Sequence, residues 1–148
     1  MSGFGTISVD FDEVPAILKS HPVSLPDSQS DIDYLLCFRT TTNDPNTLAL
    51  VRSLTDTRTE AVAMIKASQT NGPPTRTIQS IDSYLPHLFR LLVSLNNQDP
   101  VPLDKTLSFT WQSAIDQSPY SFPELVFELV MVLYTKVSIL SSHCVNFY

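Results

Sequence analysis

The sequence Pro123–Ser142, PELVFELVMVLYTKVSILSS, is the most apolar part of the chain and decides how the fold is interpreted. Pro123 opens a predicted helix over about 123–142, because proline fits the first position of a helix. Apolar side chains recur on one side at Phe122, Leu125, Val126, Leu129, Val130, Leu133, Val137 and Leu140, and on the other at Phe127, Met131 and Tyr134. A helix without a polar face needs neighbours on every side. We therefore expect it to be buried in an oligomer or to belong to a larger domain that this chain begins, and we favour the larger domain.

Two further helices are predicted upstream of this one. Asp44 as N-cap and Pro45 at the first position predict a helix over about 45–68, which the sequence Asn71–Pro74 (NGPP) ends. A second helix is predicted over about 75–95, with a kink at Pro86. Its apolar residues step by three and four at Ile78, Ile81, Leu85, Leu88, Leu92 and Leu95.

Alternating apolar residues predict two short strands, over about 6–11 and about 106–112. Their apolar positions are Ile7, Val9 and Phe11 in the first strand and Leu107, Phe109 and Trp111 in the second. We expect the two strands to pair in a small sheet. The segments His21–Ser30 and Ser118–Tyr120 are predicted to be a loop and a turn. The expected fold is thus mostly α, with a small N-terminal β-sheet.

Composition excludes several classes of protein. The 148 residues include 15 acids and 9 bases, for a net charge of −6, and no basic stripe, so nucleic acid is not an expected partner. The three glycines cannot build a phosphate-binding loop. The apolar run Leu125–Leu140 is interrupted by Glu128 and Lys136 and is short for a bilayer, so we expect no integral membrane insertion. Cys37 and Cys144 are interpreted as reduced thiols of a cytoplasmic protein.

No group of residues predicts catalysis, a cofactor or a metal site. The three histidines, His21, His87 and His143, have no metal-ligand spacing. The sequence Ser141–Cys144 places possible nucleophiles beside a base, but no nucleophile elbow or orienting acid accompanies them. Glu124 and Glu128 are four residues apart and could form an acid/base pair. A structural role is favoured for them, with Glu128 buried and hydrogen-bonded. The chain is not expected to be an enzyme.

The order of several short motifs resembles a known family. These motifs are Phe4–Val9, the helical Ser83–Leu88 (SYLPHL), Leu107–Ala114 (LSFTWQSA) and Leu125–Tyr134 (LVFELVMVLY). In the same order, they are similar to the N-terminal part of the Bro-one (BRO) domain, an endosomal-targeting domain. Within that family, they are most similar to the fungal pH-response regulators of the PalC type. The resemblance covers most of the chain but only about the first third of such a domain.

The resemblance implies the start of a helical, solenoid-like domain that binds proteins. BRO domains bind the Snf-type subunit of ESCRT-III through an amphipathic helix that docks in an apolar groove. The implied protein is a cytoplasmic adaptor, recruited peripherally to endosomal or plasma membranes in ambient-pH signalling. An alternative is a small helical module, unrelated to ESCRT, that associates with itself through its last helix. In either case we expect Leu133, Val137 and Leu140 to form an exposed apolar binding face.

Overall fold

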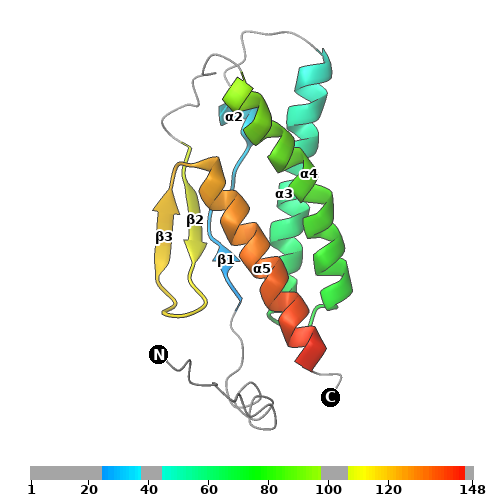
Figure 1. Ribbon diagram of the computed structural model, residues 1–148, viewed down its shortest axis with the longest axis vertical. Coiled ribbons are helices and arrows are strands. Elements are labelled where there is room, and N and C mark those ends of the chain that lie inside the picture. Colours follow the sequence, from blue (N-terminus) through cyan, green and yellow to red (C-terminus); the bar gives the residue numbers. More distant parts are fainter. Residues whose placement is uncertain (1–24, 38–44, 98–106, 146–148) are drawn as a thin grey trace, which may run out of the picture.

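The computed structural model describes residues 25–37, 45–97 and 107–145 (Figure 1). Within these residues the chain is mostly helical, with one small antiparallel sheet. The elements in chain order are β1 (Asp27–Ser28), α2 (Tyr34–Cys37), α3 (Pro45–Ser68), α4 (Pro74–Asn97), β2 (Phe109–Gln112), β3 (Pro119–Phe122) and α5 (Leu125–Val145). The general fold class expected from the sequence, mostly α with a small sheet, is confirmed.

Helix α3 begins at Pro45 and ends at Ser68, where the sequence predicts a helix over about 45–68. The turn that ends it is tight. Asn71 adopts a left-handed conformation, with φ of 89°, and the Gly72 N–H donates to the Ala67 carbonyl at 2.8 Å. This bond across the helix end satisfies a carbonyl that would otherwise lack a partner. Pro74 then opens α4.

Helices α3 and α4 are the most extensively packed pair of elements. The buried face of α4 carries Ile81 and Leu88, which were predicted from the sequence, and Tyr84, which was not, while the predicted Ile78, Leu85 and Leu92 are partly buried. Thr77 attaches the start of α4 to α3 by donating its hydroxyl to the Met64 carbonyl at 3.2 Å. Pro86 lies within α4, and the helix continues past it to Asn97.

The sheet differs from the one expected. Its strand order is β1-β2-β3, with β2 paired antiparallel to both neighbours. Trp111 on β2 lies opposite Ser28 on one side and Tyr120 on the other. The segment predicted as the loop His21–Ser30 therefore contributes β1, and the predicted turn Ser118–Tyr120 runs into β3, so both of these assignments are wrong in part. The strand predicted over about 6–11 lies outside the described residues.

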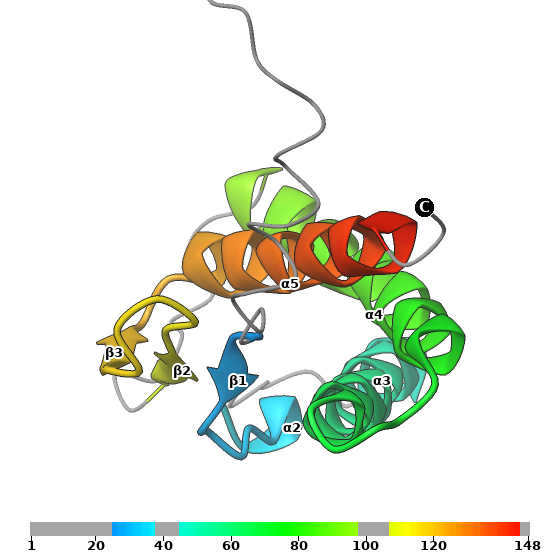
Figure 2. The ribbon, with the colours of Figure 1, turned by 90° about the horizontal axis from the view of Figure 1, so that it is seen from below.

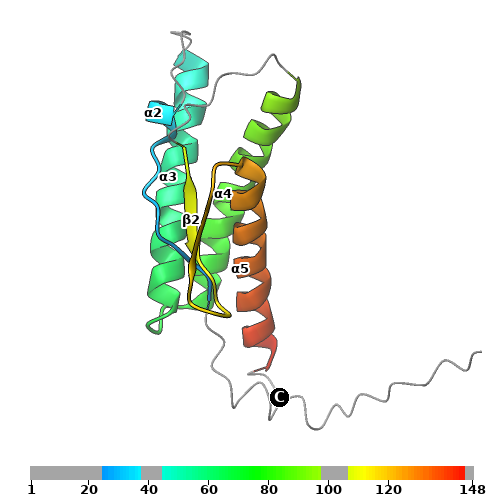
Figure 3. The same cartoon turned by 90° about the vertical axis from the view of Figure 1, so that its left-hand side faces the viewer.

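Helix α5 lies antiparallel to α4 and closes one side of a ring of elements. Seen from below, α3 and α4 lie on the side of the ring opposite the sheet, and α5 spans from the sheet to α4 (Figure 2). The third view shows α5 running downward beside the upward-running α4 (Figure 3). The largest apolar side chains buried inside this ring are Tyr34, Ile65, Ile81, Tyr84, Leu88, Phe109, Trp111 and Val132. Helix α5, like α3 and α4, has one side toward this core and one side toward solvent.

Candidate functional site

The inner face of α5 is not purely apolar. Its buried residues step by three and four, and they are Leu125, Glu128, Val132, Thr135 and Ile139. Glu128 and Thr135 are fully buried. The Thr135 hydroxyl donates to the Met131 carbonyl of the preceding turn at 2.7 Å. Glu128 needs partners from other elements, because an unpaired carboxylate is very costly to bury.

Three donors from three elements meet the Glu128 carboxylate. Arg58 Nε of α3 donates to Oε1 at 2.8 Å, and the Tyr84 hydroxyl of α4 donates to the same oxygen at 3.1 Å. Trp111 Nε1 of β2 donates to Oε2 at 2.7 Å. Since the Tyr84 proton points to Glu128, Tyr34 is the donor in the 2.8 Å hydrogen bond between the two hydroxyls. We call these five residues the Glu128 network.

The N–H donors of the Arg58 guanidinium find acceptors on several elements. Its Nη1 donates to the Ser30 carbonyl at 3.0 Å, and its Nη2 donates to the Ser28 hydroxyl at 3.0 Å. The guanidinium also lies 5.9 Å from the centre of the Phe109 ring, within cation–π range. Burial is the largest single effect and acts to lower the pKa of Arg58, but the charge of Glu128, its hydrogen bond to Arg58 and the two tyrosines together outweigh burial, so the pKa is raised. Arg58 therefore keeps its charge; its ion pair with Glu128 ties α3 to α5, and its bond to Ser28 ties α3 to β1.

The two tyrosines of the network stay protonated. Burial is the main cause that raises the pKa of both Tyr34 and Tyr84, and the negative charge of Glu128 adds to it. Neither hydroxyl is placed to act as a base, and every donor of the network points inward to a protein acceptor. The network is thus structural. Its consequence for function is that it fixes how α5 is rotated about its axis.

That rotation exposes a continuous apolar stripe on the far side of α5. We call it the outer stripe, and it consists of Val126, Val130, Leu133, Val137 and Leu140. Between 41% and 59% of the surface of each residue is exposed. The three residues expected from the sequence to form a binding face, Leu133, Val137 and Leu140, all lie on it.

The stripe continues onto the β2–β3 hairpin through an apolar hollow. The hollow has a volume of about 420 Å³, and α5 contributes Phe127, Met131 and Tyr134 to its wall. Tyr120 and Ile115 line it from the hairpin. It is also lined by Pro26, Trp111, Ser113, Ala114, Asp116 and Phe122.

Aromatic packing and one hydrogen bond hold the hairpin at the edge of this hollow. The rings of Phe122 and Phe127 lie 4.8 Å apart between centres, which joins β3 to α5. The Tyr120 hydroxyl donates to the Asp116 carboxylate at 2.7 Å. This bond lowers the pKa of Asp116 and raises that of Tyr120, so both groups keep their usual ionisation state at neutral pH. At the hairpin tip, Ile115 is 89% exposed.

The exposed apolar residues are concentrated on this part of the molecule. Among the described residues, thirteen large hydrophobic side chains are exposed. Eleven of them belong to α4, the hairpin or α5, and the other two are Leu36 and Leu50. The ion pair between Lys136 of α5 and Asp82 of α4 sets the register of the two antiparallel helices. Phe89 lies seven residues, about two helical turns, after Asp82, so the two residues share one face of α4. The exposed Phe89 is therefore on the face of α4 that borders α5.

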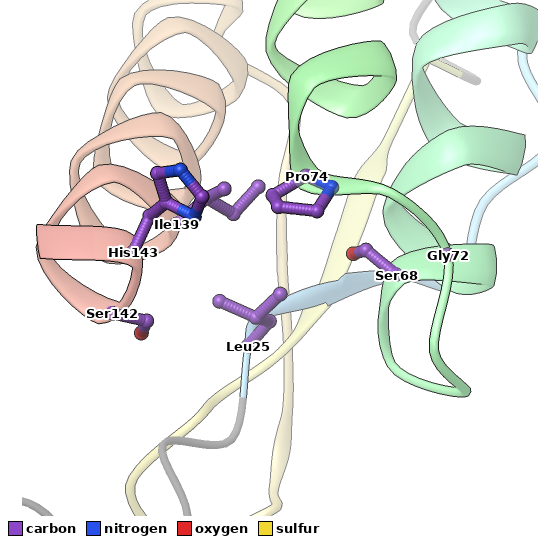
Figure 4. A pocket seen from close by; sticks show the side chains of 7 residues that line it. All are labelled: Leu25, Ser68, Gly72, Pro74, Ile139, Ser142 and His143. Carbon is purple, nitrogen blue, oxygen red and sulfur yellow. The ribbon is translucent and has the colours of Figure 1, made fainter. Parts of the chain in front are cut away.

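A second, smaller cavity lies at the other end of α5. It has a volume of about 210 Å³ and is lined by Leu25, Ser68, Gly72, Pro74, Ile139, Ser142 and His143 (Figure 4). The His143 ring lies over this cavity opposite Leu25 (Figure 4). The Ser68 hydroxyl is already bonded to the Ile65 carbonyl at 2.7 Å. No arrangement of nucleophile, base and orienting acid is formed there by the described residues.

The remaining candidates from the sequence do not come together. Glu124 is exposed ahead of α5, whereas Glu128 is buried against Arg58, so they do not form an acid/base pair. His87 and His143 lie on different helices, and His21 is outside the described residues. Within the part of the chain that the structure describes, no three histidine, cysteine or acidic residues gather as metal ligands.

Helix α5 is longer than the apolar run identified in the sequence. The 19-residue stretch Leu125–His143, with a mean hydropathy of 1.6, is long and apolar enough by length and composition to cross a membrane. The expectation that this run is too short is therefore wrong as an argument from length. Core helices of soluble proteins have the same composition. Here Glu128 and Lys136 both form ion pairs with the other helices.

Comparison with known proteins identifies no relative. No protein-family model matches the chain, no curated protein matches its sequence, and no solved structure matches its fold. The similarity to BRO domains therefore remains a prediction from the quoted motifs.

Proposed function

We propose that this chain is a non-enzymatic adaptor whose outer stripe and hairpin hollow bind an amphipathic helix of a partner protein. On the resemblance to BRO domains, that partner is the Snf-type subunit of ESCRT-III. The adaptor then works in the cytoplasm, is recruited peripherally to endosomal or plasma membranes, and connects ESCRT to ambient-pH signalling. The BRO identity and the solenoid-like architecture are parts of the same proposal.

One observation carries the proposal: eleven of the thirteen exposed large hydrophobic side chains of the described residues lie on α4, the hairpin and α5. The largest apolar patch on a typical soluble monomer is about 300–600 Å² and is commonly an interaction site. An amphipathic helix docks by placing residues three and four apart into an apolar groove. The outer stripe, with an apolar hollow along its side, offers a surface of this kind.

The hairpin itself favours a helix over a strand as the partner. Strand β3 is at the edge of the sheet in the described residues, and an added strand would have to pair with its outer edge. Pro119 has no N–H to donate, and Pro123 directly follows the strand. Proline at such positions is a common way to prevent pairing at a sheet edge. The partner is therefore expected to contact side chains of α5 rather than the backbone of β3.

A peptide titration tests this function. A fluorescent peptide carrying the C-terminal amphipathic helix of a Snf-type ESCRT-III subunit is titrated with the full chain. Val137→Asp should weaken binding by more than about tenfold, because it places a charge in the apolar contact. Leu50→Asp is the matched control, since Leu50 is 51% exposed on α3, away from the stripe. The proposal fails if the peptide does not bind, or if both variants weaken binding equally.

A further inference from the structure

The residues of the outer stripe are regularly spaced along α5. Val126, Val130, Leu133, Val137 and Leu140 are separated by four, three, four and three residues. This is the spacing of the a and d positions of a heptad repeat, with Val130 and Val137 at a and leucine at two of the three d positions. Valine at a with leucine at d favours the pairing of two helices. The stripe is therefore patterned like one half of a two-helix seam.

The residues beside this seam allow two copies to approach. The stripe itself carries no charge, although each copy has a net charge of −6. The neighbouring e positions are Phe127, Tyr134 and Ser141, which are also uncharged. Lys136, at a g position, is neutralised by Asp82 of its own copy. Like charges therefore do not oppose each other across a seam formed by two α5 helices.

The area of the stripe is near what a dimer needs. At about half exposure, its five side chains and Tyr134 bring on the order of 70–100 Å² each, or about 500 Å² per copy. The exposed Phe89 and Val93 of α4 raise this to about 700 Å². A standard stable interface buries about 800 Å² per partner. The surface is thus large enough for a dimer of modest affinity and too small for a permanent one.

We propose that the occupant of the outer stripe in the chain alone is a second copy of the same chain, paired along α5 by a two-fold axis. A two-fold interface uses one patch twice, so no second kind of apolar surface is required. Dimerisation and binding of a partner helix use the same residues, and each excludes the other. The inference does not depend on the proposed function, since it concerns the chain without any partner.

Sedimentation equilibrium of the full chain tests the dimer. Across about 1–200 µM protein, the mass should rise from that of the 16.5 kDa monomer to twice that value, with a midpoint of micromolar order. Val137→Asp should raise the dissociation constant by more than about tenfold, while Leu50→Asp should leave it within about twofold. Because Asp at position 137 could unfold the chain, Val137→Thr provides a milder variant with a smaller shift in the same direction. Circular dichroism of each variant measures its helix content.

The outcomes separate clearly. Lower mass with retained helicity for Val137→Asp and Val137→Thr, and not for Leu50→Asp, supports the α5 dimer. A wild-type chain that stays monomeric throughout overturns it, even if the ESCRT-III peptide binds. A dimer that survives in the Val137 variants, or is lost equally in Leu50→Asp, also overturns it. If the peptide fails to bind while the dimer behaves as expected, only the proposed function fails.

Discussion

At the scale of single residues, Glu128 is the group on which the arrangement of the fold depends most directly. Its carboxylate accepts hydrogen bonds from Arg58, Tyr84 and Trp111, which belong to a different helix, a third helix and the sheet. A hydrophobic residue at this position would pack against the core without specifying where each element must lie. The carboxylate accepts hydrogen bonds only from donors in the correct positions, so the network sets the rotation of α5.

Replacing Glu128 should therefore destabilise the whole fold. Glu128→Gln keeps the shape but leaves the buried Arg58 without its counter-charge, and we expect a loss of about 3–5 kcal/mol in the free energy of unfolding. Arg58→Met combined with Glu128→Leu should cost less than the sum of the single substitutions, because the pair is removed together. Urea denaturation of the wild type, Arg58→Met, Glu128→Leu and the double variant measures this coupling in a double-mutant cycle. Additive losses would show that the pair does not interact as described.

The buried tyrosines predict a loss of stability in alkaline solution. Folding raises the pKa of Tyr34 and Tyr84 above the value of about 10 of an unfolded tyrosine, mainly through burial. Above pH 10 the unfolded chain releases these protons while the folded chain keeps them. Their contribution to stability is therefore complete below pH 10 and falls as pH rises further.

Tyr34→Phe isolates this contribution. At pH 8 the variant should be less stable than wild type by about 1 kcal/mol, because the hydrogen bond from Tyr34 to Tyr84 is lost. As pH rises through 10 to 11, the difference should narrow or reverse, because the variant has one ionisable tyrosine fewer. The urea midpoints of the wild type and of Tyr34→Phe, measured at pH 8 and again between pH 10 and 11, give the difference in stability. A gap that stays constant with pH would contradict the buried, protonated state of Tyr34.

At the scale of elements, local signals located the helices well. Asp44-Pro45 and the NGPP sequence bracket α3, and the three-four spacing of isoleucine and leucine marks α4, so these bounds follow from neighbouring residues alone. The sheet was harder to infer, because β1 has only two residues and every residue of β3 is exposed. A strand with no buried side gives no alternating pattern. For this reason β1 was predicted as part of a loop, and the start of β3 as part of a turn.

The candidate site was predictable only in part, for a related reason. The apolar character of α5 is visible in the sequence, and Leu133, Val137 and Leu140 were expected to be exposed. Which face is inside depends on Glu128, whose partner Arg58 is seventy residues away. Since no local pattern joins residues at that separation, the polar inner face and the extent of the outer stripe could only come from the tertiary structure.

The turn between α3 and α4 supplies a prediction at this scale. A Cβ added at Gly72 would lie 2.8 Å from both the carbonyl carbon and the carbonyl oxygen of Ala67. Because these are backbone atoms, Gly72→Ala should force the turn open and cost about 1–3 kcal/mol. Asn71→Gly is the matched control, since it removes a side chain from a left-handed residue and should be neutral or slightly stabilising. Thermal denaturation ranks the two variants, and equal losses would contradict this description of the turn.

At the scale of the whole molecule, charge and apolar surface are separated. The net charge of −6 belongs to the chain as a whole, while the outer stripe carries none of it. The two ion pairs described here, Arg58 with Glu128 and Lys136 with Asp82, join elements within the molecule. Contacts made through the stripe are therefore expected to depend on apolar burial rather than on attraction between charges.

This separation predicts a weak dependence on salt for anything that binds the stripe. Interfaces held by opposite charges lose affinity as salt screens them, whereas burial of apolar surface is little affected by screening. Two copies that each carry −6 repel one another at low salt, so added salt should leave self-association unchanged or strengthen it slightly. Sedimentation equilibrium of the chain, and titration of the ESCRT-III peptide, at about 50 mM and 500 mM salt measure the change. Weakening of either interaction by more than about tenfold would mean that charged groups outside the stripe hold the contact, and the docking surface would then have to be sought elsewhere on the molecule.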